Sequence, residues 1–245
     1  PPTTTVESPP PPPIASPPPA PPMTSYQINY HAPSSGGCES STYVGATVKV
    51  RGYVSAVDNN GFYMQDNPTS AAYQGMWVYT TSGGGWLIGR AVGQLVEVVA
   101  VVEEYWDLTE LKDLISLTVI SSGHAMVPLV ATTGAIGTAC TASGEAHEGL
   151  LVTVNNVQIT SEPNQYGEIG ITDGTGETQL EDGILNTVLH LGAQAVAGTS
   201  IRQITGVVRY AFGSFEIHPR SAADITVSGV VASPPPPTSS AVSSP

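Results

Sequence analysis

Short stretches in which apolar and polar residues alternate fill the middle of the chain. Val48, Val50 and Val54 alternate with other residues, and Gly52 lies where a strand would kink. A period of two residues predicts β-strands, and no segment of the middle has a helical period, so we expect an all-β fold. Asp58-Asn59-Asn60-Gly61 predicts a hairpin turn. Further strands are predicted at 62–65, 76–79, 92–102 and 114–120, with a loop at 81–85.

The same pattern recurs about 105 residues later. Gly-Ala-Thr-Val-Lys-Val at 45–50 returns as Gly-Leu-Leu-Val-Thr-Val at 149–154. A segment that begins with glycine at 61 and ends with aspartate returns at 167–173, and a strand ending in Tyr105 returns at Tyr210. Three landmarks in one order and with nearly one offset indicate an internal duplication. The middle of the chain therefore predicts two domains, at 38–130 and 140–228.

Both ends of the chain are rich in proline. Of the 22 prolines, 17 lie before residue 23 or after residue 233. Proline fixes φ near the polyproline II value and donates no backbone hydrogen bond, so these segments predict extended rods. At about 3.1 Å per residue, the first 22 residues would span roughly 65 Å. We expect a Pro-rich arm at 1–30 and a Pro/Ser-rich linker at 229–245, which suit a connector better than a catalyst.

The charge balance excludes several classes of partner. Seven basic residues face 20 acidic ones, a formal net charge of −13. Clustered Lys and Arg, which nucleic acids and anionic membrane surfaces require, are missing from the sequence. No apolar run approaches the roughly 20 residues of a membrane span. The chain starts at Pro1 without a leader, so we expect a mature product or a segment of a longer chain.

The predicted strands resemble a known family of barrels. Five strands with a long bent first strand suggest a small Greek-key barrel, the oligonucleotide/oligosaccharide-binding (OB) fold. Val-Lys-Val-Arg-Gly-Tyr-Val at 48–54, Gly-Phe-Tyr-Met-Gln-Asp at 61–66 and His-Pro-Arg-Ser-Ala-Ala-Asp-Ile at 218–225 resemble OB-like domains that accompany secreted bacterial endonuclease/exonuclease/phosphatase-type enzymes. The resemblance covers about 38–227 and implies two tandem five-stranded OB-like barrels. Those enzymes keep their chemistry in a separate domain, which has no counterpart in this sequence, so no activity is implied.

The Pro-rich ends resemble a different family. A serine followed by a run of prolines is typical of plant and green-algal hydroxyproline-rich wall glycoproteins, in which prolines are hydroxylated and carry sugars. Asn67 is followed by Pro68, so no N-glycosylation acceptor exists and any sugars are expected to be O-linked. The candidate glycosylation sites are Thr3, Thr4, Thr5, Ser8, Pro9, Pro10, Pro11, Pro12, Pro13, Ser16, Pro17, Pro18, Pro19, Ser233, Pro234, Pro235, Pro236 and Pro237.

The two cysteines are candidates for a disulfide. Cys38 and Cys140 precede the two copies of the repeat by similar distances and lack the spacing of metal ligands. In an oxidising compartment we expect them to pair. The alternative is two unpaired buried thiols.

Candidate catalytic and metal-binding residues are sparse. None of the five histidines has metal-ligand spacing or lies in a nucleophile motif. Glu103-Glu104 and Glu181-Asp182 are adjacent in sequence, and adjacent strand residues point to opposite faces. Acidic turns such as Asp58 to Asp66 and Asp173 to Glu177 suit side-chain-stabilised turns or Ca²⁺. We expect no catalytic residue, no cofactor and no dedicated metal site.

Aromatic residues are the main candidates for binding. The first copy contains most of them, and we expect Tyr63, Trp77, Trp86 and Trp106 to dock a ligand or a Pro-rich arm. Strand alternation would expose one member of each adjacent pair, Phe62 or Tyr63 and Tyr105 or Trp106. Exposed aromatics stack on sugars, and aromatic grooves also bind polyproline II segments. The alternative is that these side chains fill a small core.

Two functions from different classes follow from these features. The first is an extracellular structural glycoprotein subunit, which self-associates head to tail into a fibre through its barrels and Pro-rich arms. The second is a polysaccharide- or surface-binding accessory module of a larger secreted protein, with a secreted nuclease as one such parent. Neither function is enzymatic, and neither involves nucleic acid binding by these residues or a membrane.

Overall fold

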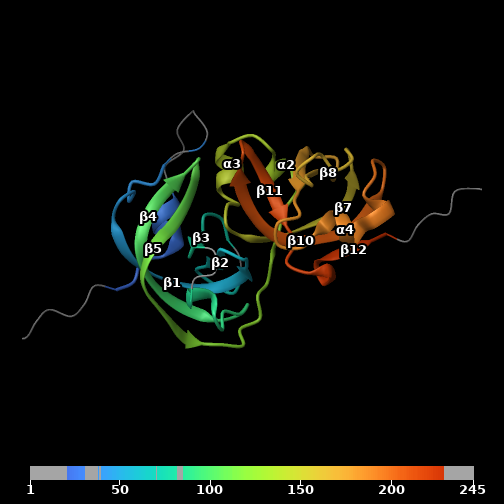
Figure 1. The fold of residues 1–245 in the computed structure, drawn as a ribbon. Coiled ribbons are helices and arrows are strands. Elements are labelled where there is room, and N and C mark those ends of the chain that lie inside the picture. Colours follow the sequence, from blue (N-terminus) through green and yellow to red (C-terminus); the bar gives the residue numbers. More distant parts are fainter. Residues whose placement is uncertain (1–20, 31–37, 39, 70, 82–84, 229–245) are drawn as a thin grey trace, which may run out of the picture.

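The structure, a computed structural model, describes residues 21–30, 38, 40–69, 71–81 and 85–228. All candidate glycosylation sites of the Pro-rich ends lie outside these residues, as do most of the predicted rods. The described chain is mostly β-structure in two units, a closed five-stranded barrel and a second sheet (Figure 1).

Five strands close the barrel in the order β1-β2-β3-β5-β4. All neighbours are antiparallel except β3 and β5, which pair in parallel. Val48, Val50 and Val54 point into a core whose members are fully or almost fully buried, as their alternation predicts. The strands are β1 (Thr47–Val57), β2 (Gly61–Gln65), β3 (Gly75–Tyr79), β4 (Leu95–Tyr105) and β5 (Leu108–Ser121).

Two features mark the middle of β1, where the sequence predicts a kink. The register with β2 shifts between Val54 and Ala56, which marks a β-bulge just beyond the predicted kink. A Cβ atom on Gly52 would lie 3.0 Å from Cγ of Met64, so the glycine makes room for that core side chain. The predicted turn after β1 is confirmed, since the Asp58 N–H donates to the Gly61 carbonyl over 2.9 Å.

Seven strands make the second sheet, in the order β12-β10-β11-β9-β8-β7-β6. An additional antiparallel pairing joins β10 to β7, and β9 and β11 are parallel, like β3 and β5. Its core is a separate cluster of mainly Val, Ile and Leu side chains. The strands are β6 (Leu129–Val130), β7 (Leu151–Ile159), β8 (Ile169–Thr172), β9 (Glu177–Leu180), β10 (Ser200–Ala211), β11 (Ser214–His218) and β12 (Ile225–Val227).

Short helices connect the strands, whereas the sequence predicted none. Each has five residues or fewer, too short to show a helical period. Within the described ranges, no helix has the length and apolar composition needed to cross a membrane. The α-helices are α1 (Ser25–Asn29), α2 (Thr133–Ile136), α3 (Ala142–Glu145) and α4 (Thr187–Leu191), and the 3-10 helices are η1 (Gly85–Leu87), η2 (Gly192–Gln194) and η3 (Ala222–Asp224).

Helix α1 corrects the predicted extent of the N-terminal arm, because residues 23–29 belong to the barrel. Thr24 and Gln27 form a capping box, and the Asp66 carboxylate accepts hydrogen bonds from the N–H groups of Ser25 and Tyr26 at 2.6 and 3.0 Å. Ile28 is fully buried in the barrel core. The aspartate after β2 therefore anchors the start of the described chain.

The predicted disulfide between Cys38 and Cys140 is present, with their Cα atoms 5.3 Å apart. Both cysteines pack against the core of the second sheet. The bond therefore ties the segment between α1 and β1 to the second unit, and it is consistent with an oxidising environment.

A third buried cluster joins the two units. Tyr63 and Trp77 of the barrel pack with Leu151 and Val207 of the second sheet, and all four are 3% exposed or less. Arg220 crosses the junction and donates from Nη1 to the Ser55 carbonyl over 3.1 Å. The junction is thus apolar, well packed and continuous with both cores.

Two glycines allow the backbones of the two units to approach each other closely at this junction. A Cβ atom on Gly75 would lie 2.3 Å from the carbonyl oxygen of Glu148, and one on Gly149 would lie 2.5 Å from the backbone nitrogen of Met76. Such distances are impossible without a backbone shift.

We expect Gly75→Ala to lower the free energy of unfolding by about 1–3 kcal/mol, because the new methyl group overpacks a backbone contact. Gly85→Ala is the matched control, since nothing lies within 4 Å of a Cβ at Gly85. Urea denaturation checks both variants. Equal stabilities of the two variants would contradict the close approach.

Candidate binding groove at the domain junction

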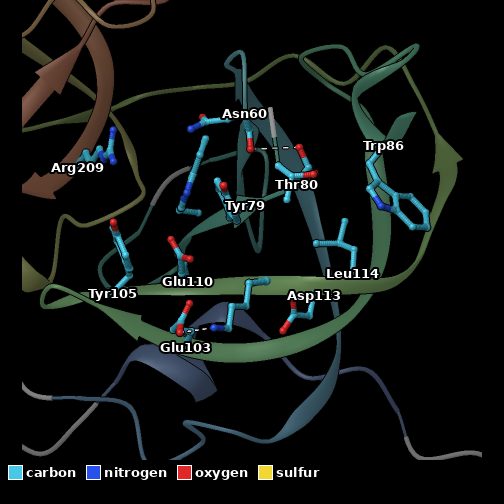
Figure 2. A pocket seen from close by; sticks show the side chains of 13 residues that line it. Asn60, Tyr79, Thr80, Trp86, Glu103, Tyr105, Glu110, Asp113, Leu114 and Arg209 are labelled. Atoms are coloured by element: carbon cyan, nitrogen blue, oxygen red, sulfur yellow. Dashed lines mark hydrogen bonds and ion pairs between the residues drawn. The ribbon is translucent and has the colours of Figure 1, made fainter. Parts of the chain in front are cut away.

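A pocket of about 620 Å³ lies on the barrel, next to the junction. Trp77, Tyr79, Trp86 and Tyr105 contribute aromatic rings, and Glu103, Glu110 and Lys112 contribute charged groups. Figure 2 shows Arg209 approaching from β10 of the second sheet, with Trp86 on the opposite side. We call this pocket A.

A row of three side chains on neighbouring strands forms one wall of pocket A. Trp77 on β3 pairs with Glu110 on β5, which pairs with Glu103 on β4. Cross-strand partners point to the same face, so Glu103 and Glu110 lie side by side. Glu103 also forms an ion pair with Lys112. Burial, followed by the negative charge of Glu103, raises the pKa of Glu110 to about 7.

A second pocket, of about 440 Å³, lies on the other unit and is built in the same way. Gln179 on β9 pairs with Glu216 on β11, which pairs with Arg209 on β10. Glu216 follows Glu110 by 106 residues, the offset of the repeat. The two glutamates are 4% and 2% exposed. We call this pocket B.

Burial determines the protonation states of Glu216 and His218 in pocket B. Burial, with a smaller contribution from the negative charge of Glu168, raises the pKa of Glu216 to about 8. His218 lies between two carboxyl groups, with Nδ1 3.2 Å from Glu181 and Nε2 3.3 Å from Glu216. Burial outweighs the opposing negative charge of Glu181 and lowers the pKa of His218 to about 4. At pH 6.5, Glu216 and His218 are therefore both predominantly neutral.

Three polar atoms in pocket B have no hydrogen-bond partner among the described residues. They are Nε of Arg209, Oε1 of Gln179 and Oε1 of Glu216, and each is buried. Arg209 also forms no salt bridge within the part of the chain that the structure describes. A buried polar atom without a partner costs free energy, which a suitable ligand or water would recover.

A third pocket, of about 560 Å³, lies between the tips of two equivalent hairpins and contacts both other pockets through Arg209. Trp106 ends the β4–β5 hairpin and Phe212 ends the β10–β11 hairpin. They are 79% and 98% exposed, with φ of 51° in both. We call this apolar site pocket C. Pockets A, C and B together form what we call the groove.

The predicted docking residues divide into two sets. Trp86, 37% exposed, lines pocket A, and Trp106 lines pocket C. Trp77 lines pocket A but is only 3% exposed. Tyr63 is 1% exposed, so the expectation that it docks a ligand is wrong for this structure: its ring packs 4.5 Å from that of Trp77 inside the junction.

Strand alternation misjudged both adjacent aromatic pairs. Phe62 and Tyr63 are both buried, since one side chain faces the barrel core and the other faces the second sheet. Tyr105 and Trp106 are both exposed because they lie at a hairpin tip.

Three residues of the groove are not among those predicted from the sequence: Glu110, Arg209 and Glu216. The only available signal was the 106-residue offset between the two glutamates, because strand register decides which side chains become neighbours. Glu103 and Glu104 do separate as predicted: Glu103 faces pocket A, while Glu104 accepts from the Ser41 N–H at 3.2 Å and from the Thr109 hydroxyl at 3.1 Å.

The acidic turns are satisfied by hydrogen bonds of the chain itself. The Asp173 carboxylate accepts from the hydroxyl groups of Thr133 and Thr175 at 2.7 and 2.6 Å. Despite some burial, these bonds hold the pKa of Asp173 below its usual value. Of the His, Cys, Asp and Glu side chains in the described ranges, only Cys38, Cys140 and Glu145 group closely enough for a metal ion, and the two sulfurs are bonded to each other.

Comparison with protein families gives a match over part of the chain. A family model for a domain of unknown function, DUF8508, matches residues 142–231. This span begins with α3 and covers β7 to β12, so it contains pocket B. No curated protein matches the chain.

Proposed function

We propose that the chain consists of two tandem OB-like barrels. The first unit has the strand order expected for such a barrel. In the second unit, β7, β8, β9, β11 and β10 pair in this order, and β10 also pairs with β7. This circular series of pairings supports a second barrel.

On this basis we propose that the protein is an extracellular, non-catalytic structural glycoprotein subunit that assembles end to end into a fibre. The observation that carries the proposal is pocket C, where Trp106 and Phe212 present large exposed rings at two hairpin tips. Large exposed apolar side chains that gather at one site are typical of surfaces that contact another molecule. A contact that does not close on itself produces a filament.

Two further features favour this role. The start of the described chain packs on the barrel through α1, whereas its end pairs through β12 with the second sheet, and Figure 1 shows these two places at opposite ends of the molecule. The Pro-rich segments are therefore joined to opposite ends of a firmly packed pair of domains. We propose that they carry O-linked sugars and bridge neighbouring subunits.

Replacing both exposed rings, in Trp106→Ser with Phe212→Ser, is expected to reduce self-association at least about 10-fold, because an apolar contact loses its largest side chains. Analytical ultracentrifugation and negative-stain imaging measure the effect. Leu189→Ser on α4 is the matched control, since Leu189 is 78% exposed and lies outside the groove. Compact monomers of the unmodified protein at high concentration would contradict assembly.

Pocket A favours a second candidate function, a polysaccharide-binding accessory module. Its aromatic rings and the planar polar groups of Glu103, Glu110 and Arg209 are the side chains that protein sites use to stack on sugars and to bind their hydroxyl groups. Retention of the intact protein on insoluble polysaccharides tests this function, with Trp86→Ala as the variant that should weaken retention.

A further inference from the structure

We propose that pocket B binds a neutral sugar unit through Gln179, Glu216 and Arg209, and that the groove carries the rest of the glycan toward pocket A. The inference rests on the second proposed function and assigns its site and ligand class.

The three unpartnered atoms define the hydrogen bonds that a ligand must make. The neutral Glu216 can hold its proton on Oε2, which lies 3.3 Å from Nε2 of His218, and Oε1 of Glu216 is then an acceptor. Oε1 of Gln179 is also an acceptor, whereas Nε of Arg209 is a donor. Gln179, Glu216 and Arg209 are successive cross-strand partners, so the three side chains stand next to one another on one face. The ligand must therefore donate at two points and accept at the third.

Hydroxyl groups meet this requirement, because each one both donates and accepts. Two neighbouring hydroxyls of a sugar ring can donate to Gln179 and Glu216 while one of them accepts from Arg209. A carboxylate or phosphate only accepts, so it would satisfy Arg209 and leave the two oxygens without partners. An acidic sugar also carries hydroxyl groups, but the acidic side chains of Glu168 and Glu181 line pocket B as well and disfavour a negatively charged ligand. The site therefore selects a neutral sugar over an acidic one.

The histidine beside these groups does not favour a metal ion. Both ring nitrogens of His218 already lie within hydrogen-bond distance of Glu181 or Glu216, on opposite sides of the ring. A metal ion bound at one ring nitrogen would therefore lie near only one of the two carboxyl groups. His218 instead fixes the position of Glu216, whose second oxygen is buried and has no partner among the described residues.

Aromatic side chains at the edge of pocket B provide a stacking surface. Tyr166, 68% exposed, and Phe212 line the pocket with the polar row. The C–H faces of sugar rings pack on such rings. Arg209 also lines pockets A and C, so a glycan of several units can continue past Phe212 and Tyr105 toward Trp86.

Isothermal titration of the full chain at pH 6.5 tests the proposal. The probes are neutral hexaoses of arabinose, xylose, galactose and glucose, with hexagalacturonate as the acidic comparison. We expect saturable binding of at least one neutral hexaose and weaker binding of hexagalacturonate. Arg209→Met should weaken binding by about 10-fold or more, and Gln179→Met by about 3–10-fold, as hydrogen bonds to the ligand are lost.

Arg202→Met is the matched control, because Arg202 lies on the same strand, is exposed and is separate from the groove. It should bind like the unmodified protein, and thermal melts should show that all three variants fold. Should Arg209→Met misfold, Gln179→Met carries the test.

The proposal is overturned if no neutral hexaose binds, if hexagalacturonate binds more tightly, or if neither groove variant differs from Arg202→Met. Retention on insoluble polysaccharides distinguishes failure of this site from failure of the polysaccharide-binding function. Retention that does not depend on Arg209 and Gln179 would refute this site and leave the binding function intact. Absence of both retention and hexaose binding would refute the function as well.

Discussion

Replacing Cys38 and Cys140 together by serine is expected to lower the free energy of unfolding by about 4–5 kcal/mol. The disulfide closes a loop with a sequence separation of 102 residues. A cross-link of that length restricts the unfolded chain strongly, and its loss returns this conformational freedom. Urea denaturation of the double variant, followed by tryptophan fluorescence, measures the change.

The reduced protein provides the control for this prediction. Dithiothreitol should shift the unmodified protein to the midpoint of the double variant and leave the variant itself unchanged. A loss of stability that appears in the variant but not on reduction would indicate a packing defect at the second core, against which both cysteines lie. Equal midpoints in all four samples would contradict a stabilising cross-link.

The strands whose starts the sequence predicts best are those that begin at a glycine. β2 and β3 begin at Gly61 and Gly75, within one residue of the predicted positions 62 and 76. β5 was predicted at 114–120, yet it begins at Leu108 and has 14 residues. Its first half reads Leu-Thr-Glu-Leu-Lys-Asp, where Glu110 gives no apolar signal although the groove buries it.

The groove could not be predicted from the sequence, because it depends on the register between strands and on the packing of the two units. Register sets Glu110 between Trp77 and Glu103, and it sets Glu216 between Gln179 and Arg209. Packing of the two units then buries Tyr63 and brings Arg209 to pocket A. Only the side chains at loops and hairpin tips, Trp86 and Trp106, are exposed as expected.

The pH dependence of stability tests Glu110 and Glu216, two of the buried glutamates. A carboxyl group with a raised pKa stabilises the folded state fully below its unfolded value, near 4.5, and this contribution is lost as pH rises through the folded value. The folded pKa values of Glu110 and Glu216 are about 7 and 8. His218, with a lowered pKa, works in the opposite direction, since its contribution is lost only as pH falls below 6.5.

Between pH 6.5 and 9 the glutamates therefore dominate. We expect the free energy of unfolding to fall by about 2 kcal/mol across this range, and the melting temperature by about 4–8 °C. Glu110→Gln combined with Glu216→Gln should reduce this fall, because a neutral amide replaces each neutral acid without a later ionisation. Burial also raises the pKa of Glu148, so its share of the fall remains in the variant. Glu162→Gln, at an exposed position, should leave the profile unchanged. A flat profile in the unmodified protein would contradict the prediction. It would mean that both glutamates are already ionised at pH 6.5, so that their pKa values in the folded state lie below about 7 and 8.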